Sequence, residues 1–132
     1  PNVENIETIN VTPTGAVILN LANTDSGLDS VKSVSDTGEN LTVNDLGTIP
    51  GKVGITNGTG TLTVNMKAAA VAGTSDTINI ELAGASAGAD IAITSDAVGA
   101  SSIEAATINS ISSANTLDTL ALNGASSSKE KT

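Results

Sequence analysis

Residues 77–82 read Thr-Ile-Asn-Ile-Glu-Leu, so that polar and aliphatic side chains alternate at every step. Residues 61–66, Thr-Leu-Thr-Val-Asn-Met, follow the same two-residue period. Successive side chains of a β-strand point to opposite faces, so this period predicts strands with one apolar face. The pattern recurs over residues 17–22 and 91–94, and the sequence therefore predicts many short strands.

Short polar corners separate these stretches. They are Thr14-Gly15, Asp25-Ser26-Gly27, Thr37-Gly38, Pro50-Gly51, Asn57-Gly58-Thr59-Gly60 and Asn123-Gly124. Gly and Asn favour such corners because they tolerate left-handed backbone conformations. The pair Asn57-Gly58 is also a signal for a tight hairpin between residues 53–55 and 62–66, which would favour an antiparallel sandwich.

A degenerate repeat favours a different architecture. Residues 6–11 (Ile-Glu-Thr-Ile-Asn-Val) match residues 117–122 (Leu-Asp-Thr-Leu-Ala-Leu), and residues 28–31 and 103–108 share the opening of this phrase. The spacing between copies is irregular, as in a β-solenoid whose rungs differ in loop length. Roughly 20–25 residues per rung would give about five or six rungs.

The amino-acid composition also favours stacked rungs. The chain has 132 residues with no aromatic residue, no Cys and no His, so its core must come from small aliphatic side chains. Such side chains bury little area each, and a stack of thin layers needs only a few of them per layer. We predict an all-β fold, specifically a β-solenoid resembling a parallel β-helix with irregular rungs, and the antiparallel β-sandwich remains the alternative.

The predicted domain is residues 1–125, and the polar residues 126–132 are expected to form a disordered tail. Because the chain starts at Pro1, we expect it to be a fragment of a longer protein. Two segments, residues 28–34 and 66–71, are predicted to contain a helical turn. The predicted core consists of Ile9, Val11, Val17, Leu19, Leu21, Leu41, Val43, Leu62, Val64, Ile78, Ile80, Ile91, Ile93, Ile108, Leu120 and Leu122.

Several classes of function are disfavoured by the residues that the chain lacks. Nucleophilic triads need a His or a Cys, and we therefore expect no enzymatic activity. The formal net charge of −9 disfavours a nucleic-acid partner, because phosphate binding needs clustered cations. No apolar run approaches the roughly 18 residues of a membrane span, so membrane insertion is not expected.

Calcium is the one cofactor that the sequence suggests, because only oxygen ligands are present. Residues 84–92 resemble a degraded calcium-binding nonapeptide in which Gly84, Gly88 and Asp90 keep their places. The alternative for this segment is an ordinary corner that leads into a strand. A second candidate is the acidic corner around Asp25, Asp29 and Asp36, where the alternative is a solvated surface turn.

The acidic residues of the repeat have a different predicted role. Glu7, Asp29, Glu104 and Asp118 each follow an aliphatic residue at the opening of the repeated phrase. We expect them to line one edge of the stack, where charge discourages unwanted strand pairing.

Residues 3–12, Val-Glu-Asn-Ile-Glu-Thr-Ile-Asn-Val-Thr, followed by Gly15-Ala16-Val17-Ile18-Leu19-Asn20-Leu21, carry a family resemblance. This phrase and the aromatic-poor, acidic composition resemble bacterial S-layer proteins of the type I-secreted, repeats-in-toxin-related kind, as in Caulobacter and Campylobacter. The resemblance implies a self-associating extracellular coat on the cell surface and calcium-assisted assembly. It also implies attachment to lipopolysaccharide through other parts of the parent protein.

Intact calcium nonapeptides, which belong to the secretion region of that family, are missing here. A central structural fragment is therefore the prediction. The alternative function is that of an adhesin or a spacer or binding module of a secreted surface protein, whose repeats share the acidic, Thr- and Asn-rich and Cys-free character.

Overall fold

The computed structural model describes residues 6–22, 27–34, 38–96, 103–112 and 114–124. These residues form short strands and one 3-10 helix, η1, over Ala68–Val71. The strands are β1 (Thr8–Val11), β2 (Val17–Asn20), β3 (Ser30–Val34), β4 (Leu41–Leu46), β5 (Lys52–Thr56), β6 (Thr61–Met66), β7 (Thr77–Ala83), β8 (Asp90–Ser95), β9 (Ala105–Ile111) and β10 (Thr119–Gly124).

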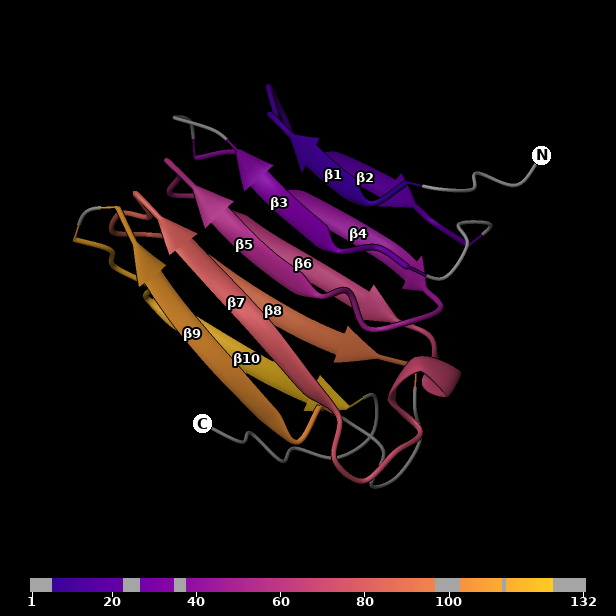
Figure 1. The fold of residues 1–132 in the computed structure, drawn as a ribbon. Coiled ribbons are helices and arrows are strands. Elements are labelled where there is room, and N and C mark those ends of the chain that lie inside the picture. The colour runs from indigo at the N-terminus through magenta and orange to yellow at the C-terminus, as the bar shows by residue number, and fades with distance from the viewer. Residues whose placement is uncertain (1–5, 23–26, 35–37, 97–102, 113, 125–132) are drawn as a thin grey trace.

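The strands alternate between two five-stranded sheets. One sheet has the order β1-β3-β5-β7-β9 and the other β10-β8-β6-β4-β2, and every pairing of described strands is parallel. Figure 1 shows the sheets as two layers whose arrows point in opposite directions. The all-β prediction is confirmed, and the parallel sheets are consistent with a β-solenoid-like fold. The antiparallel sandwich is wrong for the described strands.

One strand of each sheet makes up a rung, and the rungs differ in length. Thr8 pairs with Ser30, 22 positions later, whereas Val53 pairs with Ile80, 27 positions later. Part of the difference lies between β6 and β7, where η1 and a polar corner lengthen the connection. The first rung is β1 with β2, and the last is β9 with β10 (Figure 1).

Aliphatic ladders between the sheets form the core. In parallel strands, residues in register share a face, so each inward position repeats from rung to rung. One ladder of the first sheet runs through Ile9, Val31, Val53, Ile80 and Ile108. The corresponding ladder of the second sheet runs through Val17, Leu41, Leu62, Ile91 and Leu120. Their members in the middle rungs are fully buried.

The predicted core is largely confirmed. Leu41, Val43, Leu62, Val64, Ile78, Ile80, Ile91, Ile93 and Leu122 are buried, and Ile9, Val11, Val17, Leu19, Leu21 and Leu120 pack partly buried against them. The prediction is wrong for Ile108, which is 49% exposed because its strand ends the stack. Val31, Val53 and Ile55 are buried although they were not predicted, and in β3 the inward Ser33 interrupts the aliphatic alternation.

Two local predictions fail and one holds. Asn57-Gly58 does not close a hairpin, because β5 and β6 lie in different sheets and Asn57 N donates to Ala83 O of the next rung (2.9 Å). Residues 30–34 form β3 and not a helical turn. The turn predicted within residues 66–71 is confirmed as η1. The tail predicted at residues 126–132 lies outside the described residues.

Candidate functional site

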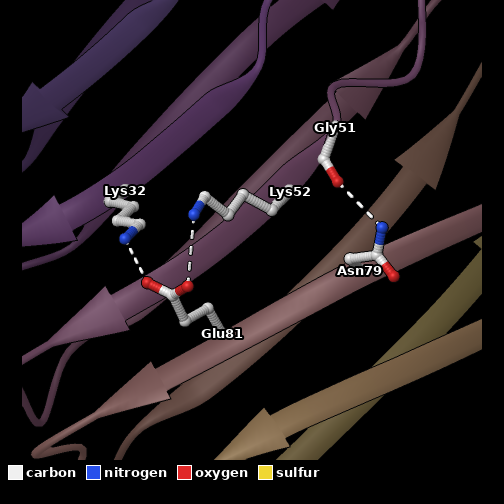
Figure 2. Close-up of polar contacts among 5 residues, drawn as sticks. All are labelled: Lys32, Gly51, Lys52, Asn79 and Glu81. Atoms are coloured by element: carbon white, nitrogen blue, oxygen red, sulfur yellow. Dashed lines mark hydrogen bonds and ion pairs between the residues drawn. The ribbon is translucent and has the colours of Figure 1, made fainter. Parts of the chain in front are cut away.

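An ion-pair cluster lies on the outer face of the first sheet. The carboxylate of Glu81 on β7 lies between the ammonium groups of Lys32 on β3 and Lys52 on β5 (Figure 2). Lys32 Nζ donates to Glu81 Oε1, and Lys52 Nζ lies 3.2 Å from Glu81 Oε2. The Glu81 side chain is 16% exposed, so solvent only partly screens the ion pairs. The cluster connects the three neighbouring strands β3, β5 and β7.

A missing side chain makes this bridge possible. Gly54 pairs with both Lys32 and Glu81 in the same ladder, so it lies between the two partners. A Cβ atom on Gly54 would lie 2.3 Å from the main-chain oxygen of Glu81. Glycine therefore leaves the gap across which Lys32 reaches Glu81. Beside the cluster, Asn79 Nδ2 donates to Gly51 O over 3.0 Å (Figure 2).

The two lysines also determine how Glu81 titrates. The hydrogen bond from Lys32 is the largest cause that holds the pKa of the Glu81 carboxyl below its usual value. Partial burial opposes this shift, and Lys52 adds to it. Glu81 is therefore an anion that stabilises the fold at neutral pH.

A polar ladder occupies the outer face of the second sheet. Asn65 Nδ2 on β6 donates to Asn44 Oδ1 on β4 over 2.5 Å, and Thr94 Oγ1 on β8 donates to Asn65 Oδ1. Stacked amides of this kind link successive rungs by side-chain hydrogen bonds that run parallel to the main-chain ladder. Both outer faces are thus built from rung-to-rung polar contacts.

Among the residues predicted to bind calcium, Asp90 is the one with an unusual environment. It is the first residue of β8, and the preceding corner has positive φ at Gly84 (79°) and Gly88 (95°). The Asp90 Oδ1 atom is buried and has no hydrogen-bond partner among the described residues. An unpaired carboxylate oxygen is costly to bury, so this atom is the best-placed protein ligand for a cation in this part of the chain.

The second predicted calcium corner is only partly described. Asp29 is exposed directly before β3, where its N–H donates to Glu7 O (2.7 Å) and its carbonyl accepts from Lys52 N (2.8 Å). Asp25 and Asp36 lie outside the described residues. The described part of the chain contains no group of three or more acidic side chains that could together hold a metal ion. A calcium ion at Asp90 or Asp29 would therefore need carbonyl, hydroxyl or water oxygens as further ligands.

Three acidic residues of the repeat precede strands of the first sheet, and the prediction that all four line one edge of the stack is wrong for Asp118. Glu7 and Asp29 are neighbours through a main-chain hydrogen bond and lie at the start of the first sheet. Glu104 lies at the start of β9 in the same sheet, where its carboxylate accepts from Asp76 N over 2.7 Å. Asp118 precedes β10 of the other sheet and accepts from Gly88 N over 2.9 Å. The predicted match of residues 6–11 with 117–122 thus joins strands of different sheets.

The described helix, η1, is four residues long, and no helix in this part of the chain is long and apolar enough to cross a membrane. Comparison with known protein families, with curated proteins and with solved structures finds no match to this chain.

Sequence reasoning missed the Lys32–Glu81–Lys52 cluster. The repeated opening at residues 6–9 and 28–31 indicates a rung length of 22 residues. The structure has this spacing, because Ile9 pairs with Val31. Counting a further 22 residues from Ser30 leads to Lys52, and these two residues do pair in the structure. The rung from β5 to β7 is longer, and the strand pattern does not encode the length of its loop. The position of Glu81 beside the two lysines could therefore not be predicted.

Proposed function

We propose that this chain is a structural module of a bacterial surface layer, built as a β-solenoid with irregular rungs, that associates with copies of itself into an extracellular coat. The observation that carries the proposal is the exposure of core positions at the end of the stack. Ile108 belongs to the same inward ladder as Ile80, yet it is 49% exposed where Ile80 is fully buried. Exposed apolar surface continuous with a core is typical of an interface.

The chemistry of the side faces supports a structural role. Several of their described polar groups contact one another from rung to rung, as in the Lys32–Glu81 bridge and the Asn44–Asn65 pair. Such contacts stabilise a scaffold. The resemblance of residues 3–12 to S-layer sequences supports the surface-layer assignment over other self-associating proteins, and it implies lipopolysaccharide attachment through other parts of the parent protein.

Calcium is part of this proposal as an aid to assembly. Each copy carries a net charge of −9, so copies repel one another until counterions reduce that repulsion. The buried Asp90 Oδ1 offers one place for a divalent ion. Calcium binding by titration calorimetry is expected to weaken in Asp90→Asn and to be retained in Asp96→Asn, which removes an exposed carboxylate at the other end of β8.

The test is size-exclusion chromatography with light scattering, in millimolar calcium and again in EDTA, followed by negative-stain microscopy of each peak. Higher oligomers or sheets that need calcium are the expected result. A monomer that is indifferent to calcium would overturn the surface-layer proposal. It would favour a spacer of an adhesin or other secreted surface protein, for which a rod of stacked rungs is also suited.

A further inference from the structure

The two ends of the stack leave inward side chains uncovered. At the last rung, Ile108 is 49% exposed and Leu120 is only partly buried. At the first rung, Ile9 and Val17 are only partly buried, although the next member of the Val17 ladder, Leu41, is fully buried. Each end thus leaves part of the same core uncovered, although Leu122 of the last rung is buried.

The end strands also carry unused edges. Among the described strands, β1 and β2 pair with β3 and β4 alone, and β9 and β10 pair with β7 and β8 alone. Their outer edges therefore present rows of main-chain donors and acceptors, which proteins usually protect with charged residues or proline.

That protection is missing from the end strands themselves. None of β1, β2, β9 and β10 contains a charged residue or a proline. Charged residues lie instead in the inner strands β3, β4, β5, β7 and β8, where no edge needs protection. Glu7, Glu104 and Asp118 lie just before β1, β9 and β10, so the charges flank these edges without lying in them.

The two ends of the first sheet have the same sequence in the same register. Residues 8–10 of β1 and residues 107–109 of β9 both read Thr-Ile-Asn. The strand pairings connect Ile9 to Ile108 through one inward ladder, and they connect Asn10 to Asn109 through the adjacent outward ladder. These segments therefore lie directly above one another at opposite ends of the molecule.

The second sheet repeats this correspondence. Residues 17–20 of β2 read Val-Ile-Leu-Asn, and residues 120–123 of β10 read Leu-Ala-Leu-Asn. One inward ladder connects Leu19 to Leu122, and Asn follows it at both ends. Both end strands of this sheet thus offer aliphatic inward positions in the same order.

From these matched ends we infer that copies of this chain stack head to tail, with β1 and β2 of one copy pairing in parallel with β9 and β10 of the next. This inference rests on the proposed self-association and specifies its contact. The inward ladders continue as Ile108 on Ile9 and Leu120 on Val17. Identical residues stacked in register pack well and let Asn side chains hydrogen-bond along the stack.

Head-to-tail contact has a definite consequence for assembly. The two contacting surfaces are different ends of the molecule, so the contact does not close into a dimer and copies add to form a filament. Screening of the charge of −9 per copy should lengthen filaments at higher ionic strength. The occupant of each end is a second copy, because the ends share Thr-Ile-Asn in the first sheet and the same order of inward aliphatic residues and Asn in the second.

The test blocks one end at a time. Ile108→Lys places an ammonium group at the last rung, Ile9→Lys does so at the first, and Thr77→Lys is the control at an exposed outward position of the inner strand β7. Burying an unpaired charge is costly, so each blocked variant should need roughly 100-fold more protein to assemble, or more. The control should assemble like the wild type, as measured by light scattering and negative-stain microscopy.

A mixing experiment separates end blocking from misfolding. A small fraction of Ile108→Lys should shorten wild-type filaments, because its intact first rung binds a filament end and its blocked last rung stops growth. The double variant Ile9→Lys/Ile108→Lys has no intact end and should leave filament length unchanged. Circular dichroism verifies folding, and Ser110→Lys, at an exposed inward position of β9, is the milder second variant.

The outcomes distinguish this inference from the proposed function. Calcium-dependent sheets that persist in every end-blocked variant would overturn head-to-tail stacking and leave the surface-layer proposal standing. Filaments that the blocked variants abolish, without calcium-dependent sheets, would support stacking and count against the surface layer. A wild-type chain that stays monomeric at every concentration would overturn stacking, whether its ends are free or are covered by other parts of a longer protein.

Discussion

Gly54 shows how a single residue determines which side chains on neighbouring strands can contact each other. Replacing it with alanine would bring a Cβ atom within 2.3 Å of Glu81 O, and the strands must shift to relieve this contact. We expect Gly54→Ala to lower the free energy of unfolding by roughly 1–3 kcal/mol in urea denaturation. Gly47→Ala is the control, because nothing lies within 4 Å of its added Cβ, and a change under about 0.5 kcal/mol is expected there. Equal losses at both positions would contradict this account.

The free energy of unfolding depends on pH through Glu81. Because the lysines lower its pKa in the folded state, the unfolded chain binds more protons in the pH range between the lowered and the ordinary pKa. The stabilisation is therefore complete above the ordinary pKa of a glutamate, and it is lost as pH falls through the lowered value. Glu81→Gln should be less stable than the wild type at neutral pH, and the difference should shrink in acid.

Urea denaturation across the acidic range measures this difference. Glu7→Gln is the matched control, since it removes the same charge from an exposed position before β1. A difference between wild type and Glu81→Gln that stays constant with pH would show that the ion pairs contribute nothing.

At the scale of the element, the position of a strand in the stack decides what its core residue contributes. Ile80 on β7 and Ile108 on β9 are register partners, yet the first is fully buried and the second is 49% exposed. Ile80→Ala should cost roughly 2–5 kcal/mol of unfolding free energy, and Ile108→Ala under about 1 kcal/mol. Urea titration of the monomer compares them, and similar losses would mean that the last rung is covered.

The sequence predicted the positions of the strands better than it predicted which strands pair. Strict alternation identified the strands of the middle rungs, because inward aliphatic and outward polar positions are both well filled in β6 and β7. It failed for β3, where the polar Ser33 occupies an inward position, and it identified β5 only as a strand of a hairpin. The hairpin at Asn57 failed because its conformation (φ 52°) serves a corner as well as a hairpin.

The candidate site was less predictable than the fold. Asp90 could be singled out because glycines precede it at a familiar spacing, and the structure adds that its Oδ1 atom is buried without a described partner. The Lys32–Glu81 bridge spans 49 residues of chain, so its prediction requires every intervening loop length. Local patterns determine strands, whereas contacts between rungs depend on loops that the patterns do not specify.

At the scale of the whole molecule, a stack of rungs has a gradient of stability. Each rung contacts only its neighbours, so unfolding can begin at either end without disturbing the middle. In the dilute monomer, amide hydrogen exchange should be slowest in β5 and β6 of the central rung and fastest in β1, β2, β9 and β10. Uniform protection across all described strands would contradict this nearest-neighbour picture.

Head-to-tail assembly should flatten that gradient. When copies stack, the end strands gain main-chain partners and their inward side chains lose contact with water, so opening an end rung must also break the junction. We expect amides of β1 and β9 in filaments to exchange about as slowly as those of β5, whereas Ile108→Lys at the same concentration keeps the gradient of the monomer. Lateral association through the outer faces would instead slow exchange evenly along the stack, and that pattern would count against end-to-end contact.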